Sequence, residues 1–579
     1  MKEAAAHNVS SCRWRERAYD AVAAEELRGK GLSRLTARLL SSRGVTADTL
    51  ESYLRPKLAD LACPESLQGI SEAVEVVLSA VAAGRKIVVF GDYDCDGICA
   101  TAIAVTAIRA LGADVSPFIP ERLTEGYGMT MKSLERMLQE HPGAGLVVTV
   151  DNGINCIEEV AELARRGVET VVTDHHLSSA QLPGARAVVN PKVASPACFE
   201  GLCGAGVAFM FANHLITTAR KRGIYSGGNI GGALLVLAGL ATVTDIMPLT
   251  GQNRILVAEA LKRFRMLAPA GLLGLYNCAV RSASRAKASA QPLSTRDFSF
   301  LLGPRINAAG RIASGMDALE LILCKDAERI DCLARQVDRF NDERKSIERE
   351  MTEIALSRIV AGSSAQVIEL PEGHPGVAGI VAARVMERLS ADGRAVPVCV
   401  VVDGHGSARS PDGLNICKAM QSCSSTLSRF GGHAAAGGFQ VMAGKIGEFR
   451  DALCGYCDKH ANDEVFSECT VDAWVTTDDL TFELAEAIGE MEPFGEGNPE
   501  PVFAMHTGAF ADVRPMGADG RHLQITFRDR SMPRAVWWNK GDLIEKLRSL
   551  SAAEHDIRFT VEISTYGERH LELRLQSVI

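Results

Sequence analysis

The sequence KIVVFGDYDCDG, residues 86–97, decides the fold of the first large domain. Residues 86–90 form a short run rich in β-branched side chains, which is typical of a buried strand. The next seven residues contain three aspartates and two glycines, which favour a turn. Similar apolar runs, bounded by turn residues and separated by segments of helical length, recur at residues 146–150, 169–173 and 186–189. This alternation predicts an α/β fold with a doubly wound parallel sheet.

Acidic and imidazole side chains stand at the ends of three of these predicted strands. The first strand runs into Asp92, Asp94 and Asp96, the second ends on Asp151, and the third leads into Asp-His-His at residues 174–176. The carboxyl ends of parallel strands form the ligand crevice of open α/β sheets. We therefore expect these side chains to converge on one site.

Several carboxylates in one site repel one another unless cations neutralise them. Carboxylate oxygens mixed with imidazole suit Mn²⁺ or Mg²⁺ with an open coordination position. A pair of such ions is the arrangement that clamps the attacking and leaving oxygens in phosphoester cleavage. The sequence therefore predicts a site for two ions, with Asp151 as the natural bridging ligand.

The three aspartates at residues 92–96 also have simpler interpretations. They could cap a helix N-terminus, or they could open a calcium loop of the EF-hand type. The EF-hand loop needs an acid at its twelfth position, which is Ile103 when counted from Asp92. The missing acid disfavours that loop type, and the three acidic strand ends together favour a metal site over separate caps.

At these residues the chain resembles the DHH phosphoesterase superfamily, whose name is the triplet at residues 174–176. Residues 91–97 look like its first motif, 150–153 like its second and 241–245 like its fourth. The resemblance implies metal ligands at Asp94, Asp96, Asp151, His175 and Asp245. It implies catalytic roles for Asp92, Asp151, His175 and His176, with His176 facing the substrate phosphate or the second metal.

One position departs from the wider superfamily and matches its RecJ branch. Many members have a His four residues before the position of Asp94, where this chain has Phe90, which cannot bind a metal. Residues 303–311, GPRINAAGR, resemble a RecJ signature, and residues 376–382, 406–410 and 431–433 resemble the second domain associated with it. The resemblance implies that the DNA substrate is bound by Arg305, Asn307, Arg311, Ser407, Arg409 and His433, with Ser407 and Arg409 anchoring the 5′ phosphate.

The chain has 579 residues, too many for one hydrophobic core. Apolar residues at helical spacing between residues 326 and 360 predict one long helix. Alternating apolar and polar residues beyond 468 predict a small β-barrel, with one of Trp537 and Trp538 facing its core. We expect a helical N-terminal extension packed on the sheet at 1–80, the DHH domain at 81–322, a connecting helix at 323–360, a DHHA1-like α/β domain at 361–463 and an OB-like barrel at 464–579.

The composition bounds the location and the partners of the protein. The longest apolar run, residues 233–243, is far shorter than the roughly 18 to 20 residues that span a bilayer. The N-terminus lacks the apolar core of a secretory signal, so we expect a cytoplasmic protein. The net charge of −9 argues mildly against a nucleic-acid coat protein. A basic stretch either binds nucleic acid or is a solvated loop, and it comprises Arg281, Arg285, Lys287, Arg296, Arg305 and Arg311.

The resemblance implies a single-stranded-DNA-specific 5′-to-3′ exonuclease that releases 5′-mononucleotides by two-metal phosphodiester hydrolysis in DNA repair and recombination. Such a nuclease is expected to interact with a RecQ-type helicase and a single-strand-binding protein. One alternative is a DHH-type phosphatase or nano-RNase acting on short oligonucleotides or small phosphoesters. The other is an inactive DNA-binding scaffold, which the intact acids at the matched ligand positions disfavour.

Overall fold

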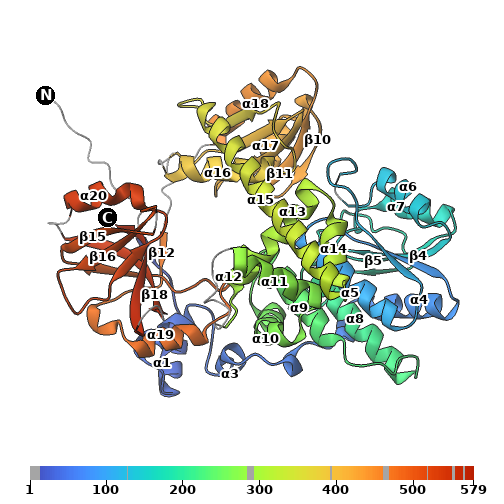
Figure 1. Cartoon of the computed structure of the whole chain (residues 1–579), viewed down its shortest axis with the longest axis horizontal. Coiled ribbons are helices and arrows are strands. Elements are labelled where there is room, and N and C mark those ends of the chain that lie inside the picture. Colours follow the sequence, from blue (N-terminus) through green and yellow to red (C-terminus); the bar gives the residue numbers. More distant parts are fainter. Residues whose placement is uncertain are drawn as a thin grey trace. The chain divides into compact units, whose positions relative to one another are not determined.

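The computed structural model describes residues 14–126, 128–282, 292–391, 394–460, 469–517, 519–550, 554–564 and 568–578 (Figure 1). The chain forms two compact units. One contains residues 58–465 and holds the predicted sheet. The other combines residues 1–57 with residues 466–579.

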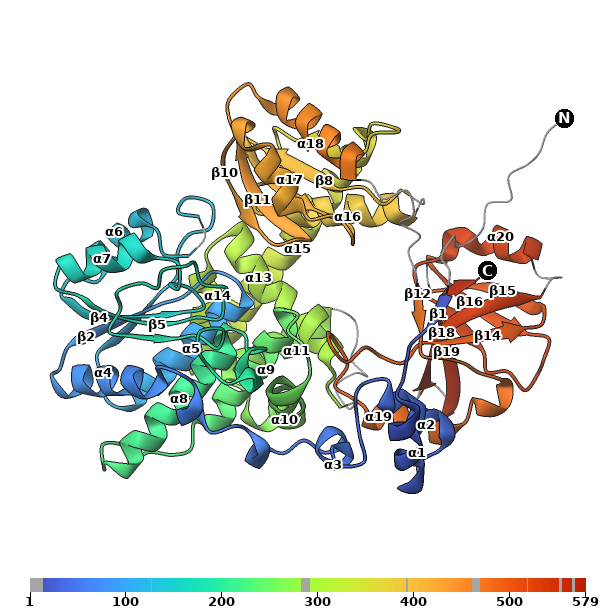
Figure 2. The same ribbon diagram turned by 180° about the vertical axis from the view of Figure 1, so that it is seen from behind.

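The first sheet has five parallel strands in the spatial order β3-β2-β4-β5-β6. Alternate side chains of β2 enter different cores, because successive residues of a strand point to opposite faces. Ile87 and Val89 pack with the helices α4, α5 and α8, whereas Val88 and Phe90 pack with α6 and α7. Figures 1 and 2 show these two helical layers on either side of the strands. The strands are β2 (Lys86–Phe90), β3 (Val115–Phe118), β4 (Ala144–Val150), β5 (Glu169–Thr173) and β6 (Ala187–Val189).

The sheet and its helices confirm the doubly wound α/β prediction. The flanking helices are α4 (Ile70–Ala82), α5 (Cys95–Ala110), α6 (Met131–Glu140), α7 (Ile157–Arg165) and α8 (Gly204–Lys221). A helical layer follows, with α9 (Gly231–Thr244), α10 (Gly251–Leu267), α11 (Ala270–Ser282), α12 (Thr295–Asp297), α13 (Gly303–Ile312) and α14 (Gly315–Leu323). The predicted long helix is α15 (Ala327–Ser357), which packs on α11 and α13 and also on α16 of the next sheet.

The second sheet of this unit has the order β10-β11-β9-β8-β7, in which β7 and β8 are parallel and the other pairs antiparallel. Met351 and Ala355 of α15 join the core between β8 and α16. The strands are β7 (Gln366–Glu369), β8 (Val398–Val402), β9 (His405–Arg409), β10 (Leu427–Gly432) and β11 (Ala436–Val441). The helices are α16 (Ala378–Ala391), α17 (Ile416–Ser422) and α18 (Ile446–His460).

The other unit is built on a seven-stranded sheet in the order β13-β14-β18-β19-β17-β16-β15. Trp537 is buried in its core and Trp538 is exposed, as predicted. The strands are β12 (Cys469–Val471), β13 (Ala473–Trp474), β14 (Phe503–Thr507), β15 (Phe510–Met516), β16 (His522–Phe527), β17 (Ala535–Trp537), β18 (His555–Ser564) and β19 (His570–Val578). The helices are α19 (Phe482–Glu490) and α20 (Ile544–Leu550).

The N-terminal segment belongs to this second unit, so the expectation that residues 1–80 pack on the parallel sheet is wrong for its larger part. β1 (Trp14–Glu16) pairs in parallel with β12. Helices α1 (Ala21–Gly29), α2 (Arg34–Ser41) and α3 (Leu50–Leu54) follow, and Leu27 and Leu40 enter the core of the seven-stranded sheet. Both Arg17 and Arg43 pair with Asp472 at 3.1 Å. These apolar and ionic contacts fix the segment to the C-terminal domain.

Across the described ranges, the structure contains no helix with both the length and the apolar character needed to cross a membrane.

Candidate metal centre

The predicted acids lie at the carboxyl ends of β2 and β4, except Asp245, which lies at the C-terminus of α9. Asp94 is the N-cap of α5, where its Oδ1 accepts a hydrogen bond from the Gly97 amide over 3.0 Å. Asp151 directly follows β4 and has φ 60, a left-handed conformation that non-glycine residues rarely adopt. Such strain is characteristic of functional sites, where the surrounding structure enforces it.

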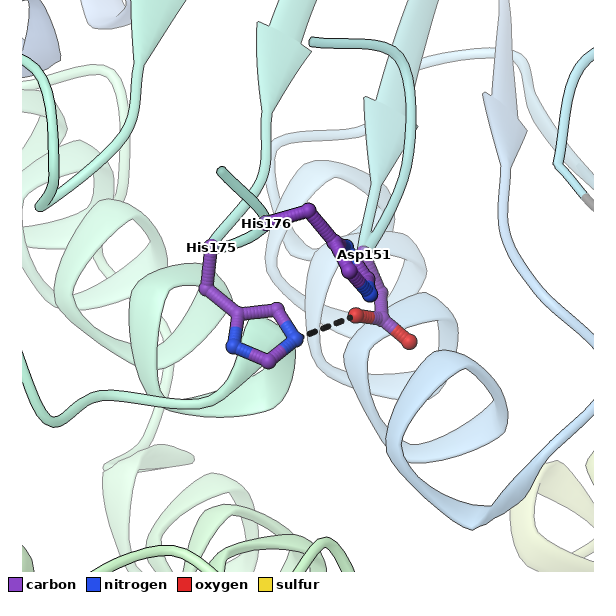
Figure 3. A group of neighbouring side chains, drawn as sticks. All are labelled: Asp151, His175 and His176. Atoms are coloured by element: carbon purple, nitrogen blue, oxygen red, sulfur yellow. Dashed lines mark ion pairs between the residues drawn. The ribbon is translucent and has the colours of Figure 1, made fainter. Parts of the chain in front are cut away.

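The acids and the first histidine of the triplet converge. His175 Nε2 lies 3.2 Å from Asp151 Oδ1, as Figure 3 shows. The same nitrogen lies 3.7 Å from Asp96 Oδ2 and 3.8 Å from Asp245 Oδ2. Three overlapping groups have ligand atoms within 4.8 Å of one another, and these are Asp92, Asp94 and Asp151; Asp96, His175 and Asp245; and Asp151, His175 and His176. All seven residues predicted as metal ligands or catalytic groups are therefore in one cluster.

Asp174 organises the triplet without joining these three groups. Its Oδ1 accepts hydrogen bonds from the backbone amide of His175 at 2.7 Å and from Nδ1 of His176 at 2.8 Å. Its Oδ2 accepts the Ile154 amide at 3.0 Å. Burial opposes ionisation, but the bond to His176 and the backbone amides outweigh it and lower the pKa of Asp174. Asp174 is thus an anionic support that orients His176.

The N-terminus of α8 holds Asp96. Its two carboxylate oxygens accept the amides of Gly204 and Ala205 at 2.7 and 2.8 Å. The positive end of a helix favours a carboxylate at this position. A Cβ on Gly204 would lie 2.5 Å from Asp151 Oδ1, so only glycine lets this helix approach the cluster so closely.

The shifted pKa values of the cluster residues indicate a site that binds cations. Burial, and then the neighbouring carboxylates, raise the pKa of Asp151 well above its usual range. Burial and the charges of Asp96 and Asp94 raise the pKa of Asp245 to about 9. Burial lowers the pKa of His175 to about 4, which leaves a neutral imidazole able to bind a metal.

Unsatisfied buried atoms point in the same direction. Within the described ranges, Oδ1 of Asp92, Oδ1 of Asp151 and Nδ1 of His175 are buried and have no hydrogen-bond partner. Buried polar atoms without partners are rare in native proteins, and an ion is one standard explanation. Oxygen-rich donors with one or two imidazoles suit Mn²⁺ or Mg²⁺. The residues present therefore fit a divalent-metal centre.

Three arginines near the cluster form no ion pair with a carboxylate among the described residues. Arg122 follows β3 and lies over the ring of Tyr93, 5.1 Å from its centroid. Burial and the charge of Arg122 lower the pKa values of both Arg311 and Arg409, so the three cations lie within electrostatic reach of one another. None of them forms an ion pair with a residue that the structure describes. A set of uncompensated cations beside a metal centre is an anion site.

Arg122 is a site residue that the sequence did not indicate. Ser407 and Arg409 lie together over Gly379, where a Cβ would lie 3.5 Å from Ser407 Oγ and 3.1 Å from Arg409 Nη2. Arg311 donates to the carbonyl oxygen of Gly376 over 3.0 Å. His433 is exposed at the β10–β11 turn, and no contact brings it to the metal cluster among the described residues.

Two of the predicted DNA-contacting residues make contacts inside the protein. Arg305 is 4% exposed, and its Nε donates to Asp338 Oδ1 over 2.7 Å, so it has a structural role, and phosphate binding by Arg305 stays a prediction. Asn307 Oδ1 accepts the Cys95 amide over 2.7 Å and so supports the first turn of α5. Of the basic stretch, Arg305 is engaged with Asp338 and Arg311 with the carbonyl oxygen of Gly376, while Arg285 and Lys287 lie outside the described residues. Phe90 is fully buried, with its ring 4.9 Å from that of Phe118, and contributes no ligand.

Three family models match successive parts of the chain. Residues 86–239 match the model of the DHH family N-terminal domain, residues 362–459 the DHHA1 domain and residues 471–577 the RecJ OB domain. The parallel sheet, the clustered acids and these domains define a protein of the DHH class.

The chain belongs to the RecJ family. The single-stranded-DNA-specific exonuclease RecJ of Dickeya dadantii is 34% identical, in an alignment that covers 85% of this chain and 86% of that protein. The Bacillus subtilis RecJ is 32% identical over 89% of this chain, and the Thermus thermophilus RecJ 36% identical over 82%. These two alignments span 64% and 66% of the relatives' lengths, so this chain matches slightly less than two thirds of each.

Solved structures agree with this assignment. The crystal structure of Thermus thermophilus RecJ in complex with Mn²⁺ matches with a TM-score of 0.83 and 30% identity, covering 98% of this chain and 80% of that one. A structure of exonuclease RecJ bound to manganese matches with a TM-score of 0.60 and 35% identity, covering 71% of this chain and 99% of that one.

Proposed function

We propose that this chain is a metal-dependent, single-stranded-DNA-specific exonuclease that removes 5′-mononucleotides from the 5′ end, in DNA repair and recombination. The observation that carries the proposal is the cluster of Asp92, Asp94, Asp96, Asp151, His175 and Asp245 beside three arginines that form no ion pair with a described carboxylate. The relatives named for single-stranded-DNA exonuclease activity and bound Mn²⁺ support it.

The cluster would hold two Mn²⁺ or Mg²⁺ ions, and Asp151 belongs to two of its three ligand groups. When bound, such ions supply Lewis acidity to the scissile phosphate and stabilise the charge that develops on its oxygens. His176, oriented by Asp174, is placed to donate a hydrogen bond to a phosphate oxygen. The Asp174 bond outweighs burial and raises the pKa of His176, which favours this donor form.

The arginine set would bind the 5′-terminal phosphate. Arg122 and Arg409 carry fork-shaped guanidinium groups that no carboxylate in the described part of the chain pairs with, and Ser407 adds a hydroxyl donor beside Arg409. Binding the terminal phosphate at a fixed place beside the metal centre would set the cut at the first internucleotide bond. This is the arrangement that 5′-to-3′ release of single nucleotides requires.

The seven-stranded sheet supports a polymer substrate. OB domains bind single strands through a charged groove and stacking aromatic side chains. A DHH-type enzyme of short oligonucleotides or small phosphoesters would need no such domain. A RecQ-type helicase that supplies the single strand, and a single-strand-binding protein that covers it, are the partners we propose on the class of substrate.

The test follows a 5′-phosphorylated single strand of 50 nucleotides, labelled in turn at each end, with Mn²⁺. We expect stepwise release of 5′-mononucleotides from the 5′ end, no cleavage of a blunt duplex, and no cleavage by Asp151→Ala. Turnover of di- to pentanucleotides alone would establish the small-substrate enzyme. Binding of the strand without cleavage under any divalent metal would establish the scaffold.

A further inference from the structure

The order of the strands places charges in sequence along the carboxyl edge of the first sheet. At one end, the loop after β3 carries Arg122. The acids follow β2 and β4, the imidazoles follow β5, and the loop after β6, at the other end, carries Lys192. Neighbouring strands lie about 4.8 Å apart, so four steps separate the ends of the row by roughly 19 Å. The metal cluster thus lies between two sources of positive charge.

Backbone contacts fix the Lys192 loop against the DHH triplet. Asn190 donates from Nδ2 to the carbonyl oxygen of His176 over 2.9 Å and accepts the Lys192 amide at Oδ1 over 2.8 Å. The Asp174 amide donates to the carbonyl oxygen of Val189 over 3.0 Å. These hydrogen bonds hold the backbone of Lys192 close to the DHH triplet, although the Lys192 side chain is exposed.

The Lys192 ammonium lies within electrostatic reach of the cluster. Its positive charge contributes to lowering the pKa of His175 and opposes the burial that raises the pKa of Asp245. It forms no ion pair with any side chain in the described ranges. An exposed and unpaired ammonium beside a metal centre attracts an anion, and the anions of the proposed substrate are its phosphates.

We infer that Lys192 binds the third phosphate of the strand, counted from the 5′ end, immediately beyond the scissile phosphodiester. The inference rests on the proposed function. The 5′-terminal phosphate would lie at Arg122 and Arg409, and the second, scissile phosphate at the metal cluster. A strand that continues along the sheet edge then meets the end of β6. Lys192 would hold the strand in register after each cut.

Substrate length gives a sharp test, because a 5′-phosphorylated dinucleotide has two phosphates and a trinucleotide has three. We expect Lys192→Ala to raise the KM for the trinucleotide about three- to fivefold, the range of an exposed ion pair. The KM for the dinucleotide and both kcat values should stay unchanged. Lys192→Arg should restore most of the affinity for the trinucleotide.

Lys262→Ala is the matched control, because this lysine on α10 is exposed and its ammonium lies 3.9 Å from Glu259, which is not a member of the cluster. A second readout is the salt dependence of binding to a long single strand in an Asp151→Asn background. Lys192→Ala should reduce the slope of log K against log salt by about 0.7, as expected for one lost phosphate contact.

The outcomes separate this inference from the proposed function. Equal losses on the dinucleotide and the trinucleotide would overturn the third-phosphate assignment, since both substrates share the first two phosphates. A variant that matches the wild type at every length would overturn any role of Lys192 in binding. A wild-type protein that cleaves no single strand with Mn²⁺ or Mg²⁺ would overturn the proposed function itself.

Discussion

Arg305 Nε donates a hydrogen bond to Asp338 Oδ1 over 2.7 Å, and this ion pair between α13 and α15 is buried. Arg305 also donates to the carbonyl oxygen of Leu301 at 2.8 Å. The pair therefore fastens the connecting helix to the end of the parallel-sheet domain. Arg409, in contrast, is partly exposed and has no carboxylate partner among the described residues.

Substitutions of Arg305 and Arg409 should have different effects, the first on stability and the second on substrate binding. Arg305→Leu leaves Asp338 buried without its cation, so we expect the free energy of unfolding to fall by about 3 kcal/mol. Arg409→Leu should change stability by less than about 1 kcal/mol and should raise the KM for 5′-phosphorylated strands without affecting 5′-hydroxyl strands. Urea unfolding and steady-state kinetics measure the two effects. A stable Arg305→Leu protein with impaired DNA binding would instead support the prediction that Arg305 binds DNA phosphate.

We expect a substitution of Asp174 to impair the metal site as much as the loss of a metal ligand would. In Asp174→Asn an NH₂ group replaces one acceptor oxygen. At the place of Oδ1 it leaves the His175 amide and His176 Nδ1 without their acceptor, and at the place of Oδ2 it leaves the Ile154 amide without its acceptor. We expect Mn²⁺ affinity or kcat to fall about 10- to 100-fold, as for other supports of metal-binding histidines. Glu135→Gln, which breaks an exposed pair with Arg166, is the control. Unchanged kinetics in Asp174→Asn would show that His176 needs no orientation.

The metal-free protein should lose stability as the pH rises. The pKa of Asp245 is raised to about 9 in the folded state, against about 3.9 in an unfolded chain. Between these values the folded state holds a proton that the unfolded state has released, so the free energy of unfolding falls with increasing pH. Urea unfolding in EDTA from pH 5 to 9 should show this fall, and Asp245→Asn should reduce it. The same slope in both proteins would mean that Asp245 ionises normally.

We predict that Asp472 anchors the N-terminal segment to the C-terminal domain. Its Oδ1 pairs with Arg17 and Arg43, and its Oδ2 accepts the Val502 amide at 2.9 Å. Asp472→Ala would leave the Arg43 guanidinium buried and unpaired, so we expect a loss of about 3 to 5 kcal/mol. Hydrogen exchange should accelerate in β1 and α1, while Asp512→Ala, in an exposed pair with Arg514, should not change it. Unchanged exchange in β1 and α1 would assign the anchoring to apolar packing alone.

The sequence predicted the parts of the structure that depend on local order. The metal-site acids at residues 92–96 and 151 follow short apolar runs, and parallel strands bring such ends together whatever the details of the helices between them. Asp245, at the C-terminus of α9, was indicated only by its motif. The prediction that one of Trp537 and Trp538 is buried needed only the alternation of a strand.

The parts that depend on distant contacts were not predictable in this way. Arg305 and Arg311 lie in one motif, but only the position of α15 shows that Arg305 is buried. Arg122 follows β3, an edge strand of four residues that includes Pro117 and gives little strand signal. The pairing of β1 with β12 joins residues that are far apart in the sequence, such as Trp14 and Cys469, and nothing near Trp14 indicates it.

The central claim is that the strand-end cluster binds two divalent ions, and manganese binding tests it most directly. Electron paramagnetic resonance of free Mn²⁺ during titration should give two ions bound per chain in the wild-type protein. Asp151→Asn, which keeps the shape of the side chain, should lose at least one of them, while Lys262→Ala should retain both. The absence of Mn²⁺ and Mg²⁺ binding by the folded wild-type protein, or equal binding by Asp151→Asn, would contradict the account.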